Sequence, residues 1–598
     1  MAALLPNAQH TGVVLAVCRG GLTMDRVSEY GRLDEEWQRR GLDRRKFLRL
    51  VAMGASVPTL SAMIAACRQG APASPPAAAG ATQAPAAAAA PTFVAKTVGT
   101  PVVAVAPTSA PRVDRSFLVA LNVEPDSLDV QDTFFNASLG VDKCLYEGLV
   151  GLDQSMQIVN QLADSWEPSA DAKIFTFKLK QGIKFHDGTP FNGQAVQATF
   201  ERVLAPDAQL KRHGYFSAAI DHVEAVDDAT VRLVTRQPFA ALVATIAHPA
   251  GGMPSPTAFK QYGQDFGTHP VGTGPFKFAE WVRGDHITLD AFSDYWDKAR
   301  GASVAHMSIK GISDPSSLAI AIQSGGAQFA GPLNAAQAQQ LQSAVGVKVV
   351  ESDSISVYWV TMNDQRKPFD NNLVRQALNY AINKDAVLKV AELGKGKIVD
   401  SPMAAGVWGY KSIKTYEYNP QKAKDLLAQA GLPDGFKTTL RFTAPSKDRA
   451  VAVQSQLQQI GVQVEAVQME VPAYQAEESK PLEDSTTELL ISNWSPSTGD
   501  ADWALRSIYS KTQWPPAGAN YGFYFNQQVE DLIMQGLQFT DETKRRDAYA
   551  RAQELIMDDA PNVFLYAPRY FSALRDNAAG AIMQADGIPY LRTAYYTS

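Results

Sequence analysis

The sequence predicts an α/β protein in which helices pack against a mostly parallel or mixed sheet. Residues 439–494 carry the clearest signal, because short apolar strand patterns alternate there with segments of helical spacing. Residues 175–180 alternate apolar and polar side chains, which is typical of a half-buried strand. The chain has 598 residues, which is too many for one hydrophobic core, so two or more domains are expected.

The strand at 175–180 is the first expected element. It is followed by the apolar residues 183–185 and by a turn at 186–190, where glycine and proline cluster. His186 and Asp187 lie in this turn and suggest a metal site or an acid/base pair. The flanking glycine and proline favour a hydrogen-bonded turn instead.

Two helices are expected outside the alternating region. Residues 373–388 repeat apolar side chains at helical spacing, and Asp370 stands where an N-cap belongs. Cys144 lies on another expected helix, between Val141 and Leu145, and is expected to be a small buried hydrophobe. The alternating region itself is expected to contain strand 440–443, helix 448–460, strand 462–467, a helix near Tyr474 and strand 489–492.

The segment from Trp494 to Trp503 follows the last of these strands and is the strongest candidate for ligand contact. Ligands of such sheets bind beyond the carboxyl ends of the strands. The segment offers two aromatic rings and the carboxylates of Asp500 and Asp502. Paired carboxylates suggest a hydrolase of the glycosidase type. The alternatives are that they bind a cationic or hydroxyl-rich ligand, or that they cap a helix.

Tryptophans in several places are candidates for stacking on a ligand. For each of them the alternative is a position in the core, and two or three are expected to have only that role. The candidates are Trp359, Trp408, Trp494, Trp503 and Trp514.

The common catalytic motifs are missing from the sequence. Residues 272–277 lack the spacing of a phosphate-binding loop and the third glycine of a dinucleotide fingerprint, and no HExxH, CxxC or GxSxG occurs. The net charge of −6 argues against nucleic-acid binding. No uncharged apolar stretch reaches the length of about 18–20 residues that a membrane span needs. We therefore expect no catalytic residue, no bound metal and no cofactor.

The N-terminal part has the layout of an export signal. The basic pair Arg44-Arg45 precedes residues 50–66, which carry no charge, and resembles a twin-arginine signal. Residues 64–67 resemble the lipobox of a bacterial lipoprotein, in which Cys67 would be acylated and would anchor the protein to a membrane. An ordinary signal cleaved at small residues, with Cys67 incidental, is the alternative.

A tether is expected to follow the signal. Of the 41 residues at 71–111, 24 are alanine or proline, which is typical of a flexible spacer. Residues 1–42 are an extension ahead of the signal, and Met24 is an alternative start. Residues 1–66 carry nine basic and six acidic side chains, so the exported chain would have a net charge of −9.

Four motif groups occur in order along the rest of the chain. They are LADSWEP at 162–168 with KFHDGTPF at 184–191, PVGTGPF at 270–276 with Tyr295-Trp296, PFD at 368–370 with VRQAL at 374–378, and YNP at 418–420 with AKDLLAQAG at 423–431. Together they resemble the extracytoplasmic solute-binding proteins, family 5, of peptide- and nickel-type ABC importers. The resemblance extends from about residue 116 to the C-terminus.

The resemblance implies a clamp of the periplasmic-binding-protein-like type II, with mixed sheets in two lobes that close over a solute. It also implies a monomer whose closed form is recognised by a membrane permease, and a solute that is not altered chemically. The expected parts are a twin-arginine-type lipoprotein signal with its extension (1–66), the lipidated cysteine and tether (67–111), lobe I (112–362) with a satellite subdomain (about 153–269), lobe II (363–561), and a return to lobe I (562–598).

One departure from the family concerns the ligand. Peptide-binding members have a Trp-x-x-Asp pattern whose aspartate binds the amino terminus of the peptide, but Ser497 occupies that position after Trp494. We expect a peptide-like solute, and an oligosaccharide or other non-peptide solute as the alternative. A secreted hydrolase and a sensory or chaperone-like clamp are further alternatives. The expected ligand-binding residues are Trp494, Ser497, Asp500, Asp502, Trp503, Asn122, Glu124, Tyr146, Asn363 and Trp408.

Overall fold

The computed structural model describes residues 113–413 and 416–597. All of these residues belong to one compact unit. The expected export signal with Arg44-Arg45, the expected lipidation site Cys67 and the tether lie outside the described residues. No helix among the described residues is long and apolar enough to span a membrane.

One mixed sheet of twelve strands runs through the described part of the chain. Along its path the strands are β16 (Gln463–Met469), β15 (Lys437–Thr443), β17 (Leu489–Trp494), β13 (Val357–Met362), β18 (Asn562–Arg575), β11 (Phe329–Leu333), β1 (Val113–Leu121), β10 (Val304–Gly311), β9 (His286–Ala291) and β8 (Phe276–Val282). Beside this path, β18 also pairs with β12 (Val347–Asp353) and β14 (Gly396–Ile398). Parallel pairs such as β15 with β16 occur together with antiparallel pairs such as β13 with β17, so the expected mixed α/β fold is confirmed.

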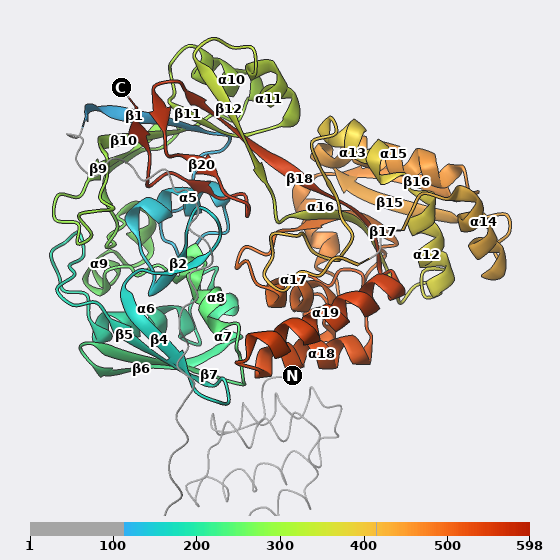
Figure 1. Ribbon diagram of the computed structural model, residues 1–598, viewed down its shortest axis with the longest axis horizontal. Coiled ribbons are helices and arrows are strands. Elements are labelled where there is room, and N and C mark those ends of the chain that lie inside the picture. The colour runs from blue at the N-terminus through green and yellow to red at the C-terminus, as the bar shows by residue number, and fades with distance from the viewer. Residues whose placement is uncertain (1–112, 414–415, 598) are drawn as a thin grey trace, which may run out of the picture. The chain divides into compact units, whose positions relative to one another are not determined.

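Strand β18 belongs to both halves of this sheet. Its residues 562–566 pair with β13, and its residues 569–575 pair with β12. Figure 1 shows it running from one half of the described chain to the other. We call the half built on β1 and β8–β12 lobe I, and the half built on β13–β17 lobe II. The boundaries expected after residues 362 and 561 fall at the end of β13 and just before β18, and they stay a prediction.

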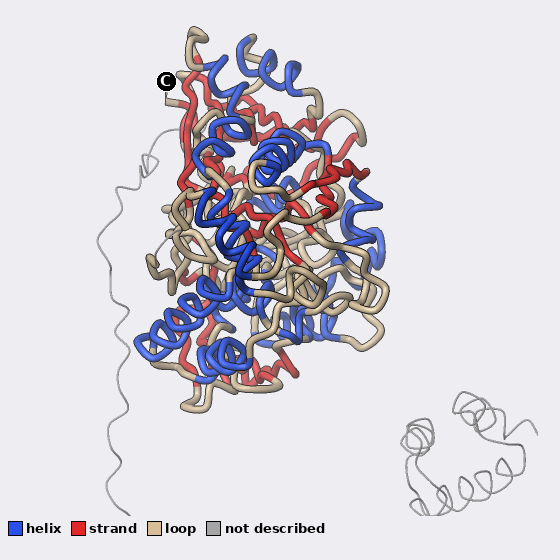
Figure 2. Tube along the Cα trace, turned by 90° about the vertical axis from the view of Figure 1, so that its right-hand side faces the viewer, coloured by secondary structure: helices blue, strands red, loops and turns tan. Residues whose placement is uncertain are grey.

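Lobe II contains the alternating helices and strands expected at 439–494. Every second residue of β15 is buried, among them Leu440 and Phe442, because successive side chains of a strand point to opposite faces. Helix α15 (Lys447–Gln458) packs Val453 and Leu457 into the same core. In Figure 2 helices lie over the strands of the half that faces the viewer. The other helices of lobe II are α12 (Asn372–Ala381), α13 (Lys384–Glu392), α14 (Pro420–Gln429), α16 (Val471–Glu478), α17 (Ala501–Tyr509), α18 (Gln527–Gln538) and α19 (Glu542–Asp559).

The prediction of a single helix at 373–388 capped by Asp370 was wrong, because the segment forms two helices and Asp370 caps neither of them. The helix begins after Asn371, whose side chain accepts a hydrogen bond from the backbone N–H of Leu373. It ends at Ala381, and Asn383 caps a second helix by accepting from the backbone N–H of Ala386. The apolar spacing continues across the break because both helices bury residues in the same core.

A separate four-stranded antiparallel sheet lies within the residues expected for the satellite subdomain, and the subdomain itself stays a prediction. Its strands, in spatial order, are β4 (Ala163–Pro168), β5 (Ile174–Leu179), β7 (Thr230–Thr235) and β6 (Ile220–Asp227). Strand β5 confirms the expected half-buried strand. Residues 183–185 form no named strand, and Lys184 makes only an isolated bridge to Pro190. The carboxylate of Asp187 accepts from the backbone N–H of Thr189 at 2.9 Å, so the expected hydrogen-bonded turn is confirmed.

The remaining elements of lobe I surround these two sheets. Cys144 is fully buried on the first of the helices, as expected. The helices are α5 (Asn136–Leu145), α6 (Gly193–Leu204), α7 (His213–Ser217), α8 (Leu242–Ala247), α9 (Pro256–Tyr262), α10 (Pro315–Gln323) and α11 (Ala335–Leu341). The short strands are β2 (Val150–Leu152), β3 (Ile158–Asn160), β19 (Ala578–Ala579), β20 (Ile582–Met583), β21 (Pro589–Tyr590) and β22 (Tyr595–Tyr596).

Candidate ligand-binding site

The segment expected as a loop from Trp494 to Trp503 is part loop and part helix. It leaves the carboxyl end of β17 and is irregular only as far as Asp500. The side chain of Asp500 accepts a hydrogen bond from the backbone N–H of Asp502 at 2.9 Å and thereby caps helix α17. Trp503 therefore lies in the first turn of that helix.

Both carboxylates of this segment are paired with arginines of the chain. Asp500 accepts two hydrogen bonds from Arg545, at 2.9 and 3.1 Å, and both side chains are buried. Asp502 accepts two from Arg506, each of 2.8 Å. Burial raises the pKa of Asp500, and the charge of Arg545 opposes this rise. The cap and these ion pairs hold the segment in place, and a role of either carboxylate in ligand contact stays a prediction.

The tryptophans expected at the site lie together in lobe II. The indole N–H of Trp494 donates to the backbone oxygen of Trp503 at 2.9 Å, and the two rings are 5.8 Å apart. Trp408 pairs through its backbone with the residues around Asp500. Its ring lies 4.4 Å from the guanidinium of Arg545. Ser497 is half-buried and lies in the loop that joins Trp494 to Asp500.

The other expected ligand-binding residues have their contacts elsewhere. The carboxylate of Glu124 accepts from the indole N–H of Trp281 at 3.0 Å, and Asn122 is exposed. Asn363 is buried and donates to the backbone oxygen of Thr487. These three residues have no hydrogen bond with the loop at 495–500 among the contacts of the described residues.

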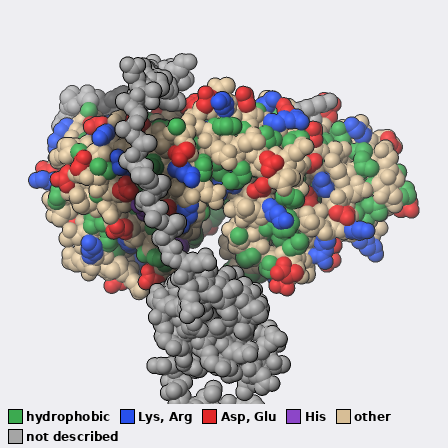
Figure 3. Space-filling model, turned by 90° about the horizontal axis from the view of Figure 1, so that it is seen from below, with side chains coloured by type: hydrophobic (Ala, Val, Ile, Leu, Met, Phe, Trp, Pro, Cys, Tyr) green, Lys and Arg blue, Asp and Glu red, His purple; other side chains and the backbone are tan. Residues whose placement is uncertain are grey.

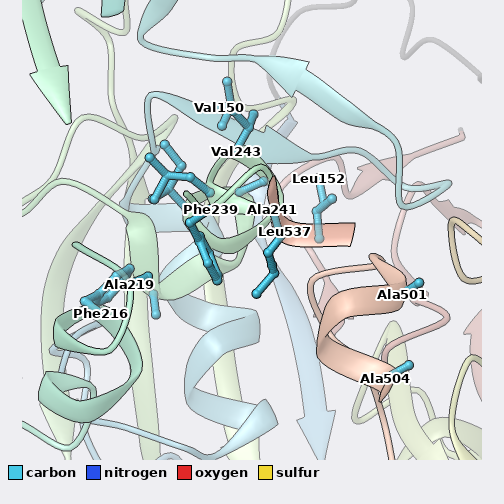
Figure 4. Packing of buried hydrophobic residues seen from close by; sticks show 14 of the residues in the cluster. Val150, Leu152, Phe216, Ala219, Phe239, Ala241, Val243, Ala501, Ala504 and Leu537 are labelled. Atoms are coloured by element: carbon cyan, nitrogen blue, oxygen red, sulfur yellow. The ribbon is translucent and has the colours of Figure 1, made fainter. Parts of the chain in front are cut away.

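The loop and helix α17 face lobe I. The ring of Trp503 lies edge-on to that of Tyr215 of α7, with 5.1 Å between the ring centres. The hydroxyl of Ser495 donates to the backbone oxygen of Asp586 at 3.2 Å. The two lobes also share one hydrophobic cluster of buried residues. Figure 4 shows Phe239 of lobe I beside Leu537 of lobe II in this cluster. The two lobes are therefore in contact around this loop.

A polar cavity lies on the lobe I side of these contacts. It is small and is bordered by α5, β2, the segment after α8 and the C-terminal residues. Tyr146, an expected ligand-binding residue, lines it and donates its hydroxyl proton to the backbone oxygen of Leu128 at 2.7 Å. The full lining is Asp142, Lys143, Tyr146, Gly148, Val150, Gly151, Leu152, Gln161, Ala247, His248, Pro249, Gly252, Tyr590 and Arg592.

Two walls of the cavity reach the interface between the lobes. The ring of His248 lies 5.6 Å from that of Tyr215, which contacts Trp503. Leu152 belongs to the hydrophobic cluster that the two lobes share. The cavity and the tryptophan loop thus lie on the two sides of one interface.

Sequence reasoning missed three residues of this site, namely Tyr215, His248 and Asp142. Tyr215 and His248 are single aromatic residues without a motif, and only the contacts between distant segments reveal their position. Asp142 lies beside Lys143 on α5, where every position from 137 to 145 is buried, although adjacent charges on a helix usually face solvent. Among the described residues, no cluster of histidine, cysteine and acidic side chains is arranged to hold a metal ion.

Comparison with known proteins places this arrangement in context. The family model of the bacterial extracellular solute-binding proteins, family 5 middle, matches residues 157–516. The chain is 40% identical over 474 residues to the glutathione-binding protein GsiB of Pectobacterium atrosepticum, a match that covers 78% of this chain and 92% of that protein. The GsiB of Shigella flexneri is 36% identical, with 79% of this chain and 93% of that protein covered.

Solved structures of periplasmic binding proteins share the fold of this chain. The periplasmic binding protein DppA of Helicobacter pylori, in complex with the peptide STSA, has a TM-score of 0.70 and 28% identity. That match covers 81% of this chain and 99% of the other. The binding protein AgaA of A. tumefaciens R10, in complex with agropinic acid, has a TM-score of 0.69, 26% identity and the same coverage.

Proposed function

The chain belongs to the bacterial extracellular solute-binding proteins of family 5, and on this premise we propose that it captures a peptide-like solute between its lobes. Proteins of this family are the solute-binding components of ABC transporters and are not enzymes. The chain is accordingly an extracytoplasmic receptor with the fold of type II periplasmic binding proteins.

The observation that carries the ligand proposal is the position of the polar cavity. Its wall includes His248, whose ring lies 5.6 Å from that of Tyr215, and Tyr215 contacts Trp503 of lobe II. A solute that extends from the cavity to this contact would stabilise the closed arrangement. The relatives named glutathione-binding protein support a peptide-like solute with several polar groups. Glutathione is the first compound to test, and an oligosaccharide is the alternative outcome.

A hydrolase that uses Asp500 and Asp502 is not supported. Each carboxylate already accepts two hydrogen bonds from an arginine, so neither is poised to donate a proton or to attack a substrate.

On the face shown in Figure 3, acidic and basic side chains of the described residues are interspersed. A continuous basic surface for nucleic acid is not visible there.

The N-terminal residues add a location to the proposal. Export through the signal that contains Arg44 and Arg45, followed by acylation of Cys67, would hold the receptor at the outer face of the cell membrane. The tether at 71–111 would then let a monomeric clamp reach its permease. Delivery of the solute to that permease completes the proposed transport cycle.

A tryptophan-fluorescence titration tests the proposal. Trp494 and Trp503 lie at the interface between the lobes, so lobe closure on a solute should change their emission. We expect a saturable change with reduced glutathione or trialanine and no change with maltotriose. A response to maltotriose alone would refute the peptide proposal and leave the receptor function in place.

A further inference from the structure

Asp142 is a buried carboxyl group without a partner. It lies on α5 at the wall of the polar cavity, and its side chain is almost fully shielded from solvent. Neither of its carboxylate oxygens has a hydrogen-bond partner among the described residues. A buried polar group of this kind is costly unless something completes its hydrogen bonds, so its presence at a cavity wall points to a ligand.

The cationic groups of the cavity are already engaged. Arg592 donates to the carboxylate of Glu147 at 3.0 Å. Lys143 donates to the side-chain oxygen of Gln584 and lies 4.0 Å from the carboxylate of Asp586. Arg212, whose charge also acts on Asp142, donates to the backbone oxygen of Thr133 at 2.8 Å. Among the described residues, no cation is therefore hydrogen-bonded to Asp142.

The remaining basic side chain of the lining is His248. Its Nδ1 accepts a hydrogen bond from the backbone N–H of Ala250 at 3.1 Å, so that nitrogen carries no proton. Burial lowers the pKa of this histidine well below its ordinary value, and the charges of Arg212 and Lys143 lower it further. His248 is therefore neutral and supplies no positive charge to Asp142.

The loop of lobe II has no free carboxylate for a cationic ligand group. Ser497 stands after Trp494 in the loop. The carboxylates of Asp500 and Asp502, farther along, are each held by an arginine. On the lobe I side, in contrast, Asp142 lines the cavity, and neither of its carboxylate oxygens has a hydrogen-bond partner among the described residues.

We propose that Asp142 binds the ammonium group of the captured solute in the lobe I cavity. The solute is then a peptide-like compound with a free primary amine, and its amino end lies in lobe I rather than at the tryptophan loop. An ammonium donates three hydrogen bonds, which matches a carboxylate with both oxygens unpaired. This inference rests on the proposed receptor function and specifies which end of the solute is recognised.

A double comparison of protein and probe tests the inference. Calorimetric titrations compare reduced glutathione with N-acetylglutathione, and trialanine with N-acetyltrialanine, against the whole exported chain. The variants are Asp142→Asn and, as a matched control, Asp364→Asn. Asp364 is likewise buried and has an oxygen without a hydrogen-bond partner, but it lies in lobe II and 3.7 Å from Arg375.

In the unsubstituted chain, acetylation of the probe should weaken binding at least about thirtyfold, because it removes one member of a buried charge pair. Asp142→Asn should bind the free amine weakly and should lose the preference for it. Asp364→Asn should keep the full preference. The unfolding midpoint of each variant, measured without ligand, establishes that the protein tested is folded.

The outcomes separate the inference from the proposed function. If the chain binds free and acetylated probes equally well, or if Asp142→Asn keeps the preference, Asp142 does not bind the amine while the receptor function stands. If no peptide binds in either form, the peptide proposal itself is wrong, and the inference is wrong with it.

Discussion

The guanidinium of Arg545 donates two hydrogen bonds to the carboxylate of Asp500, at 2.9 and 3.1 Å, and both residues are buried. Asp500 also caps the helix that carries Trp503. This pair therefore joins α19 to the start of α17 and holds the end of the tryptophan loop in place within lobe II. It gives Asp500 a structural role that is independent of any contact with the solute.

Asp500→Asn should destabilise the fold. The substitution leaves Arg545 buried without its counter-ion, and breaking a buried pair in this way costs about 3–5 kcal/mol. Urea unfolding of the ligand-free chain measures the loss. The double variant Asp500→Asn with Arg545→Met should lose less than the two single variants together, because no charge is then left unpaired. Wild-type stability of Asp500→Asn would show that the pair contributes nothing.

Asp142→Asn should have the opposite effect on the ligand-free chain. Burial raises the pKa of Asp142 well above its ordinary value, and the charges of Asp129 and Asp126 raise it further while Arg212 opposes them. A raised pKa favours the folded state below the unfolded pKa, and that stability is lost as pH rises through the folded pKa. The neutral variant avoids this loss.

Thermal unfolding at several pH values measures this effect. At neutral pH Asp142→Asn should melt above the unsubstituted chain, and the two midpoints should converge as pH falls toward the ordinary pKa of an aspartate. A variant that melts below the unsubstituted chain at neutral pH would mean that the carboxylate is already stabilised by a partner. If Asp142→Asn is more stable than the unsubstituted chain and also binds amines more weakly, Asp142 is retained for ligand binding and not for stability.

Tyr215→Ala should weaken solute binding. The edge-on contact of Tyr215 with Trp503 links the lobes, and an aromatic pair of this kind is worth about 0.5–1.5 kcal/mol. Loss of the contact should lower affinity about two- to tenfold, as measured by titration with reduced glutathione. Tyr262→Ala is the control, since that ring stacks on His269 within lobe I. Equal losses in both variants would mean that the interface is not the cause.

Cys67→Ser should release the protein from membranes. Without the thiol no acyl chain can be attached, so the lipid anchor is lost. Fractionation of cells that express the whole chain, followed by detection in the membrane and soluble fractions, measures the change. Retention of the variant in the membrane fraction would contradict the lipid anchor. Cys144→Ser is the control, because that cysteine is buried within lobe I.

Much of the fold could be predicted because the spacing of apolar residues within a single strand or helix identifies that element. Each second residue of β15 enters the core, and Val453 and Leu457 of α15 repeat at helical spacing, so the sequence itself records these elements. The break between α12 and α13 was missed because the apolar spacing runs through it. Only the caps at Asn371 and Asn383 mark the two starts, and asparagine is also common in turns.

The site was harder to predict because its residues come from distant parts of the chain. Asp142 and Lys143 are adjacent charges on a helix, a pattern that usually faces solvent. Here they are buried because the segment after α8 and the C-terminal residues close over them. The tryptophan loop was found because it follows an apolar strand, but the partners of Asp500 and Asp502 could not be read from spacing alone.

Titration of the purified exported chain with reduced glutathione, followed by mass spectrometry of the recovered solute, tests the central claim most directly. We predict saturable binding of one solute to each chain and recovery of the solute intact. Failure of every free-amine peptide to bind, or recovery of cleaved solute that depends on Asp500, would contradict a receptor that captures a peptide-like solute between its lobes.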